Sequence, residues 1–120
     1  MPSPILNDWN VSYSTIVYFE ERLTAHPAVG SFRRVRDILF EVVSSKGGET
    51  SVLIINEYTL GAAGMMKAHR GFPTAKCVVN VGNWNSNTPE AETYGREVGV
   101  KLLSINAFFA HVGRLRGRTH

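Results

Sequence analysis

Two carboxylates stand where chemistry at the end of a sheet would need them. Glu57 comes two residues after the apolar run 52–55, and Asp37 lies inside a second β-rich run, residues 32–45. Carboxylates at strand ends can share a divalent cation or transfer protons. The alternative interpretation is that Glu57 closes its strand at the surface and that Asp37 pairs with a neighbouring arginine.

Side chains that suit nucleic acid occur in three stretches. Arginines contact phosphates with a salt-dependent affinity, and a tryptophan among amides can form a recognition surface. The alternatives are a solvated strand edge, a loop whose tryptophan folds back on the core, and a frayed terminus. The candidates are Arg33, Arg34 and Arg36, then Asn83, Trp84 and Asn85 of the loop 82–87, and finally Arg114 and Arg116.

The spacing of apolar residues predicts the elements that position these side chains. Helical spacing predicts helices over 14–24, 61–71, 89–98 and 106–115, the third with Thr88 as N-cap and Pro89 at its first position. Alternating or continuous apolar runs predict strands over 32–45, 51–58, 75–81 and 100–105. The turn-forming residues 46–49 make the first two strands an antiparallel hairpin.

This order of elements predicts an α/β fold with a mixed four-stranded sheet flanked by helices. Right-handed crossovers make strands two, three and four parallel, with strand one antiparallel beside strand two. The carboxyl ends of the parallel strands then share one edge with the start of strand one, and ligands of open α/β sheets bind at such an edge. We expect the two acids, the first three arginines and the loop 82–87 to meet there.

The register of the hairpin decides whether the two acids cooperate. A loop with an odd number of residues centred on Gly47 places Asp37 and Glu57 on the same face of the sheet, whereas a two-residue Gly47-Gly48 loop places them on opposite faces. The sequence allows both registers.

Over roughly residues 14–112, the chain resembles the restriction-endonuclease-like superfamily, PD-(D/E)XK, in its Mrr-type branch. The resemblance is carried by a helix and an acid-bearing hairpin, followed by AKCVVNVG at 75–82 and PEAETYGREVGVKLL at 89–103. It implies a nuclease fold in which an Asp on one strand and an acid on the next bind a divalent metal. A lysine two residues after the second acid helps to position the attacking water.

Carried over by position, Asp37 matches the first acid and Glu57 the second. The implied metal ligands are therefore Asp37 and Glu57, and the implied cofactor is Mg²⁺ or Mn²⁺, which would activate water and stabilise charge on the phosphate. The position of the lysine is occupied by Thr59, and Lys67 in the next helix is the nearest substitute. A relative that keeps the fold and has lost cleavage is the alternative.

The composition predicts one soluble domain over residues 1–120, with a short leader (1–12) and a basic C-terminal tail (113–120). A chain of 120 residues with 43% hydrophobic and 19% charged residues can bury a single core. The net charge of +3 permits a polyanionic partner. Cys77 has no disulfide partner, and no apolar run approaches the ~20 residues that cross a membrane. We expect a cytoplasmic protein without membrane contact.

These observations predict a nucleic-acid-associated domain, either a divergent metal-dependent nuclease or an inactive DNA-binding relative. Two other functions stay open. One is a non-enzymatic protein-interaction module, such as a homodimer, that uses the loop 83–87. The other is a small-ligand sensor in the same crevice. Shared metal binding requires the Asp37 and Glu57 carboxylates to lie on one face within about 5 Å.

Overall fold

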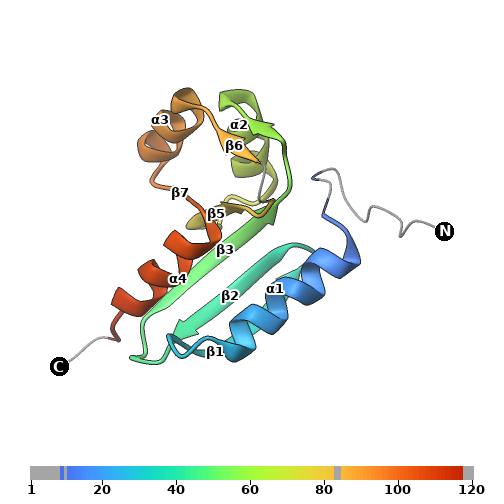
Figure 1. Ribbon diagram of the computed structural model, residues 1–120. Helices are drawn as coiled ribbons and strands as arrows, with labels where there is room; N and C mark the ends of the chain where they lie inside the picture. Colours follow the sequence, from blue (N-terminus) through green and yellow to red (C-terminus); the bar gives the residue numbers. More distant parts are fainter. Residues whose placement is uncertain (1–8, 10, 83–84, 118–120) are drawn as a thin grey trace.

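The computed structural model describes residues 9, 11–82 and 85–117 (Figure 1). Most of the expected leader, the loop residues Asn83 and Trp84, and positions 118–120 of the expected tail lie outside the described residues.

A mixed sheet in the order β1–β2–β3–β5–β7 forms the centre of the protein. Its strands are β1 (Val29–Arg36), β2 (Leu39–Ser44), β3 (Glu49–Ile55), β5 (Cys77–Asn80) and β7 (Lys101–Leu103). β2 is antiparallel to both β1 and β3, whereas β3, β5 and β7 are parallel. The predicted α/β class, the hairpin and the parallel order of the last three strands are confirmed.

The predicted strand over 32–45 is wrong, because it is two strands joined by a turn at Asp37 and Ile38. Asp37 has a φ of +47°, in the left-handed region that Asp tolerates better than most residues. The turn contains no Gly or Pro, so the sequence lacks the usual turn signal. The main sheet therefore has five strands rather than four.

Four helices flank the sheet, at positions within one or two residues of those predicted. They are α1 (Tyr13–Ala25), α2 (Ala62–Gly71), α3 (Pro89–Val98) and α4 (Ile105–Arg114). The side chains of Ser12, Thr88 and Ser104 cap α1, α3 and α4 by accepting a hydrogen bond from a backbone N–H in the first turn. No helix in the described part of the chain could span a membrane.

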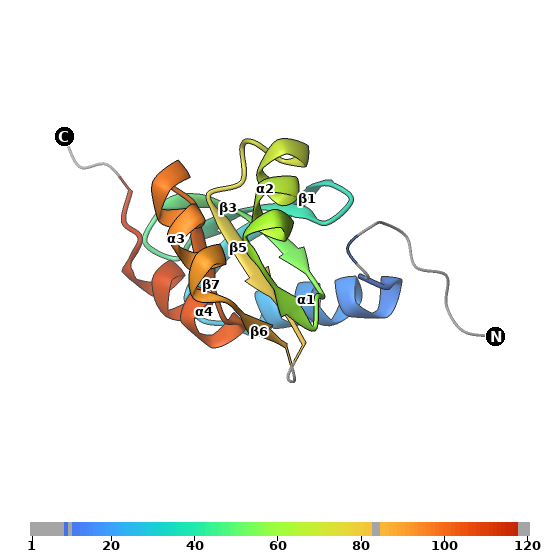
Figure 2. The ribbon, with the colours of Figure 1, turned by 90° about the horizontal axis from the view of Figure 1, so that it is seen from above.

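Helices α1 and α4 cover one face of the sheet, and α2 and α3 cover part of the other (Figure 2). Phe19 of α1 packs against Phe40 of β2, with ring centroids 5.2 Å apart, and lies 6.0 Å from Phe108 of α4. On the opposite face, Met65 and Ala68 of α2 pack over Val78 of β5. The β1–β2–β3 part of that second face has no helix over it and carries exposed side chains such as Arg33 and Glu41.

Candidate functional site at the carboxyl edge of the sheet

An asparagine cluster occupies the carboxyl edge, where β3 and β5 end. Asn80, the last residue of β5, is 8% exposed. Its Oδ1 accepts hydrogen bonds from the Glu57 backbone N–H (2.9 Å) and from Asn85 Nδ2 (2.9 Å). Its Nδ2 donates to the Glu57 carbonyl (2.8 Å) and to Asn87 Oδ1 (3.1 Å). The Asn80 amide therefore ties the chain after β3 to the chain after β5.

Glu57 lies beyond the ladder of the main sheet. β3 ends at Ile55, and the next residue, Asn56, donates its backbone N–H to the Trp9 carbonyl (3.0 Å). The chain then enters β4 (Thr59–Leu60), which pairs in parallel with β6 (Ser86–Asn87). Glu57 is thus held through its backbone in a connection between the main sheet and this small pair, which the sequence did not predict.

Asp37 lies at the same end of the sheet, in the turn between β1 and β2. Its Oδ1 is 3.5 Å from Arg34 Nη2, and the backbone carbonyl of Asp37 accepts a hydrogen bond from Arg34 Nε. The first acid is therefore engaged by a neighbouring arginine, as in the alternative interpretation of the sequence.

The hairpin register is now defined. Ser44 donates its backbone N–H to the Gly48 carbonyl (2.7 Å), which leaves a three-residue loop centred on Lys46, and Gly47 has a φ of +90°. An odd loop places residues 37 and 57 on one face if both strands continue that far. The ladder ends at the pair Leu39–Leu53, however, so pairing between strands does not align Asp37 with Glu57.

The lysine that the resemblance implies has no counterpart on β3, the central strand, because neither Thr59 nor Lys67 lies there. Thr59 is an exposed residue of β4, outside the main sheet. Lys67 of α2 places its Nζ 4.4 Å from the centroid of the Trp9 ring, a cation–π contact. Because Trp9 also binds Asn56 through its carbonyl, Lys67 does lie near the carboxyl edge, with its ammonium group over an indole.

The arginines predicted to bind nucleic acid do not form one surface. Arg33 pairs with Glu41 across the β1–β2 ladder, with Nη2 2.7 Å from Oε1, and the guanidinium of Arg36 lies over the Phe72 ring at 4.7 Å. Arg114 and Arg116 lie at the opposite end of the sheet, beside the turn between β2 and β3. Arg36, the last residue of β1, is thus separated from Arg114 and Arg116 by the length of β2, whereas Arg33 lies in the middle of β1.

Residues 113–117 are not a frayed tail. Arg114 ends α4, the Leu115 carbonyl accepts a hydrogen bond from Ser44 Oγ (2.7 Å), and Gly117 donates its backbone N–H to the Lys46 carbonyl (2.9 Å). The fit is close at Gly48, where a Cβ atom would lie 2.6 Å from the Arg116 nitrogen. The β2–β3 turn therefore holds the chain after α4 through its backbone.

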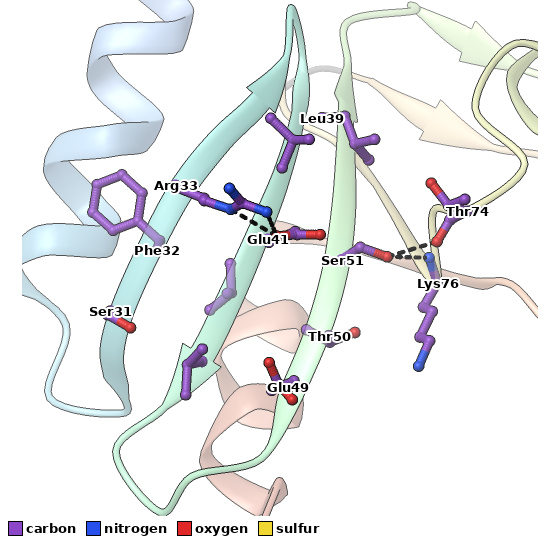
Figure 3. Close-up of a pocket in the computed structure, with 13 residues that line it drawn as sticks. Ser31, Phe32, Arg33, Leu39, Glu41, Glu49, Thr50, Ser51, Thr74 and Lys76 are labelled. Carbon is purple, nitrogen blue, oxygen red and sulfur yellow. Dashed lines mark hydrogen bonds and ion pairs between the residues drawn. The ribbon is translucent and has the colours of Figure 1, made fainter.

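Two hollows accompany these groups. One of about 400 Å³ lies at the carboxyl edge between the N-terminal ends of α1 and α4, and Tyr18 and Asn56 line it. A larger groove of about 590 Å³ lies on the uncovered face of β1, β2 and β3, where Arg33, Glu41 and Ser51 form a cross-strand row (Figure 3). The alternation in the sequence placed Arg33 and Glu41 on one side of a strand, but it did not predict that a groove forms on that side.

The buried thiol of Cys77 is a poor candidate for catalysis. Burial raises the pKa of the Cys77 thiol, and its hydrogen bond with Thr50 opposes that shift. A buried, protonated thiol is a poor nucleophile. Among the described residues, no group of three or more His, Cys, Asp or Glu side chains is arranged to hold a metal ion.

Comparison with known proteins adds no relative. No family model, no curated protein and no solved structure matches this chain.

Proposed function

We propose that the protein is a nucleic-acid-associated domain of the restriction-endonuclease-like type that binds its partner without cutting it. The observation that carries the proposal is the order of elements from α1 through β1, β2, β3 and α2 to β5, in which both acids lie at the carboxyl end of β3. That order, with the segments 75–82 and 89–103, is similar to the Mrr-type branch of the superfamily. The fold supports the proposal by analogy, and the side chains decide the chemistry.

Three features of the carboxyl edge favour binding over cleavage. The sequence position of the catalytic lysine is Thr59 in β4, the ammonium group of Lys67 lies over Trp9, and Asp37 is paired with Arg34. A metal-dependent nuclease needs an unobstructed pair of carboxylates and a cation or base that positions water. The first carboxylate of this chain already has a cationic partner.

A divergent nuclease is the second candidate, since Asp37 and Glu57 do lie at one end of the sheet. In that case these two side chains would hold Mg²⁺ or Mn²⁺, and Lys67 would leave Trp9 to face the metal-bound water. The metal would supply an activated water and stabilise the charge on the phosphate.

An assay with supercoiled plasmid distinguishes binding without cleavage from nuclease activity. The parent protein, Asp37→Ala and Glu57→Ala are each incubated with plasmid and Mg²⁺ or Mn²⁺, and both binding and cleavage are followed. We expect all three proteins to bind the plasmid in a salt-sensitive manner and to leave it intact. Cleavage by the parent that both substitutions abolish would instead identify the nuclease.

A protein-interaction module is the remaining candidate of another class, and the uncovered sheet face favours it. The groove on that face carries both charges of the Arg33–Glu41 pair together with Glu49 and Lys76. A protein that binds no nucleic acid and sediments as a dimer would support this function. If the protein were a small-ligand sensor, the hollow beside Tyr18 is where the ligand would bind.

A further inference from the structure

The cations of this protein differ in whether an acid already neutralises them. On β1, Arg33 is paired with Glu41 and Arg34 with Asp37. Beside the β2–β3 turn, at the other end of the sheet, three exposed cations make no ion pair with any described residue. They are Lys46, Arg114 and Arg116, and we call them the basic end.

Two contacts bring these three residues together. Lys46 Nζ donates to the Gly113 carbonyl (3.2 Å), and Arg116 forms a β-bridge with Gly47. Arg114 is the last residue of α4. The β2–β3 turn and the end of α4 thus present one positively charged surface, and the chain after α4 reaches that turn in Figure 1.

Helix electrostatics accounts for only part of this charge. Arg114 lies in the last turn of α4, where a cation stabilises the negative end of the helix dipole. Lys46 lies in a turn and Arg116 lies beyond the helix, so they have no such role. Glu49 at the start of β3 makes no ion pair with any described cation, so it does not neutralise them.

We propose that the basic end binds the phosphate backbone of nucleic acid, an inference that rests on the proposed function and deepens it. Nucleic-acid phosphates bind clustered cations by releasing counterions. Membrane surfaces also attract such clusters, but they usually require apolar side chains that insert. The exposed large hydrophobic residues of the described chain lie elsewhere, at Tyr13, Tyr18, Val35, Tyr58 and Met66.

DNA bound at the basic end would lie away from the two acids. The basic end lies at the end of the strands opposite Asp37 and Glu57. A duplex bound there leaves the two acids without a phosphate, so the protein binds nucleic acid and does not cut it.

The salt dependence of DNA binding tests the location. Affinity for a labelled 30-bp duplex is measured over a series of salt concentrations for the parent and for Arg114→Gln/Arg116→Gln. Each lost phosphate contact reduces the slope of log affinity against log salt by about 0.9, so the double variant loses about 1.8. Lys46 is left unchanged because its side chain also binds Gly113.

A second double variant controls for net charge. Arg70→Gln/Arg96→Gln removes the same two positive charges from exposed positions outside the basic end, and we expect it to keep the parental slope. Equal losses in the two double variants would overturn the inference. A loss confined to Arg33→Gln/Arg34→Gln/Arg36→Gln would also overturn it and would place the DNA on β1. Thermal unfolding of every variant identifies those that fail to fold.

The parent protein distinguishes failure of this inference from failure of the proposed function. A parent that binds duplex with a slope unchanged in the basic-end variant contradicts the inference alone. A parent that binds no duplex contradicts both. Binding to vesicles of phosphatidylserine and phosphatidylcholine, in the absence of duplex binding, would assign the basic end to a membrane surface and overturn the inference.

Discussion

At the scale of single residues, the Asn80 side chain joins the two strands that end at the carboxyl edge. Both atoms of its amide are used twice, toward the Glu57 backbone and toward Asn85 and Asn87. A buried amide with this many partners is costly to remove, because each partner loses a hydrogen bond away from water.

We expect Asn80→Ala to lower the free energy of unfolding by about 2–3 kcal/mol, since it leaves the Glu57 N–H and carbonyl without this partner. Asn87→Ala removes one of the same hydrogen bonds and should cost about 1 kcal/mol. Urea denaturation of both variants measures the two effects. Equal losses would mean that Asn80 does not organise the edge.

His111 makes the stability of the fold depend on pH. Burial lowers its pKa below the ordinary 6.5, and the charges of Lys101 and Arg114 lower it further. As the pH falls below the ordinary value, the unfolded chain takes up this proton before the folded chain does, so stability falls until the folded His111 also becomes protonated. His111→Gln should flatten this part of the pH profile in chemical denaturation. An unchanged profile would assign the pH dependence to other groups.

At the scale of elements, the β2–β3 turn and the chain after α4 act as one unit. We expect Gly48→Ala to lower the free energy of unfolding by about 1–3 kcal/mol, because the new Cβ would meet the backbone of residues 115 and 116. Gly71→Ala is the matched control, with nothing within 4 Å of the added atom, and should be neutral or slightly stabilising. Thermal unfolding compares them, and equal effects would contradict the close fit.

Thr59, at the position where the proposed family would have a lysine, lies in the small pair of β4 and β6. Thr59→Lys recreates the family spacing after Glu57, but the new side chain would project from β4 rather than from the central strand. We expect this variant to leave plasmid intact in Mn²⁺. Nicking that appears in Thr59→Lys and disappears in Thr59→Lys/Glu57→Gln would show that the residue does reach the acids.

Helices were predictable because their signals are local. Ser12, Thr88 and Ser104 supply caps, and Pro89 begins α3 at the position where its missing N–H costs nothing. The turn at Asp37 was missed, since it lacks Gly and Pro and the apolar alternation continues through it. The Asn80 contacts depend on two strands that meet only in the folded sheet, so spacing in the sequence does not reveal them.

At the scale of the whole molecule, the two ends of the sheet differ in charge and in chemistry. The carboxyl edge holds the two acids, the asparagine cluster and the hollow beside Tyr18. The opposite end holds the β2–β3 turn, the end of α4 and the three cations of the basic end. We propose binding without cleavage because a phosphate backbone bound at the basic end would lie away from the two acids.

Binding of DNA without cleavage can be tested on the same samples in one experiment. Fluorescence anisotropy of a labelled 30-bp duplex is followed as the full chain is added in Mg²⁺ at low salt, and the same samples are then run on a denaturing gel. We expect a saturable rise in anisotropy that salt reverses, with every strand intact on the gel. Unchanged anisotropy, or strands cut by the parent and spared by Asp37→Ala, would contradict it.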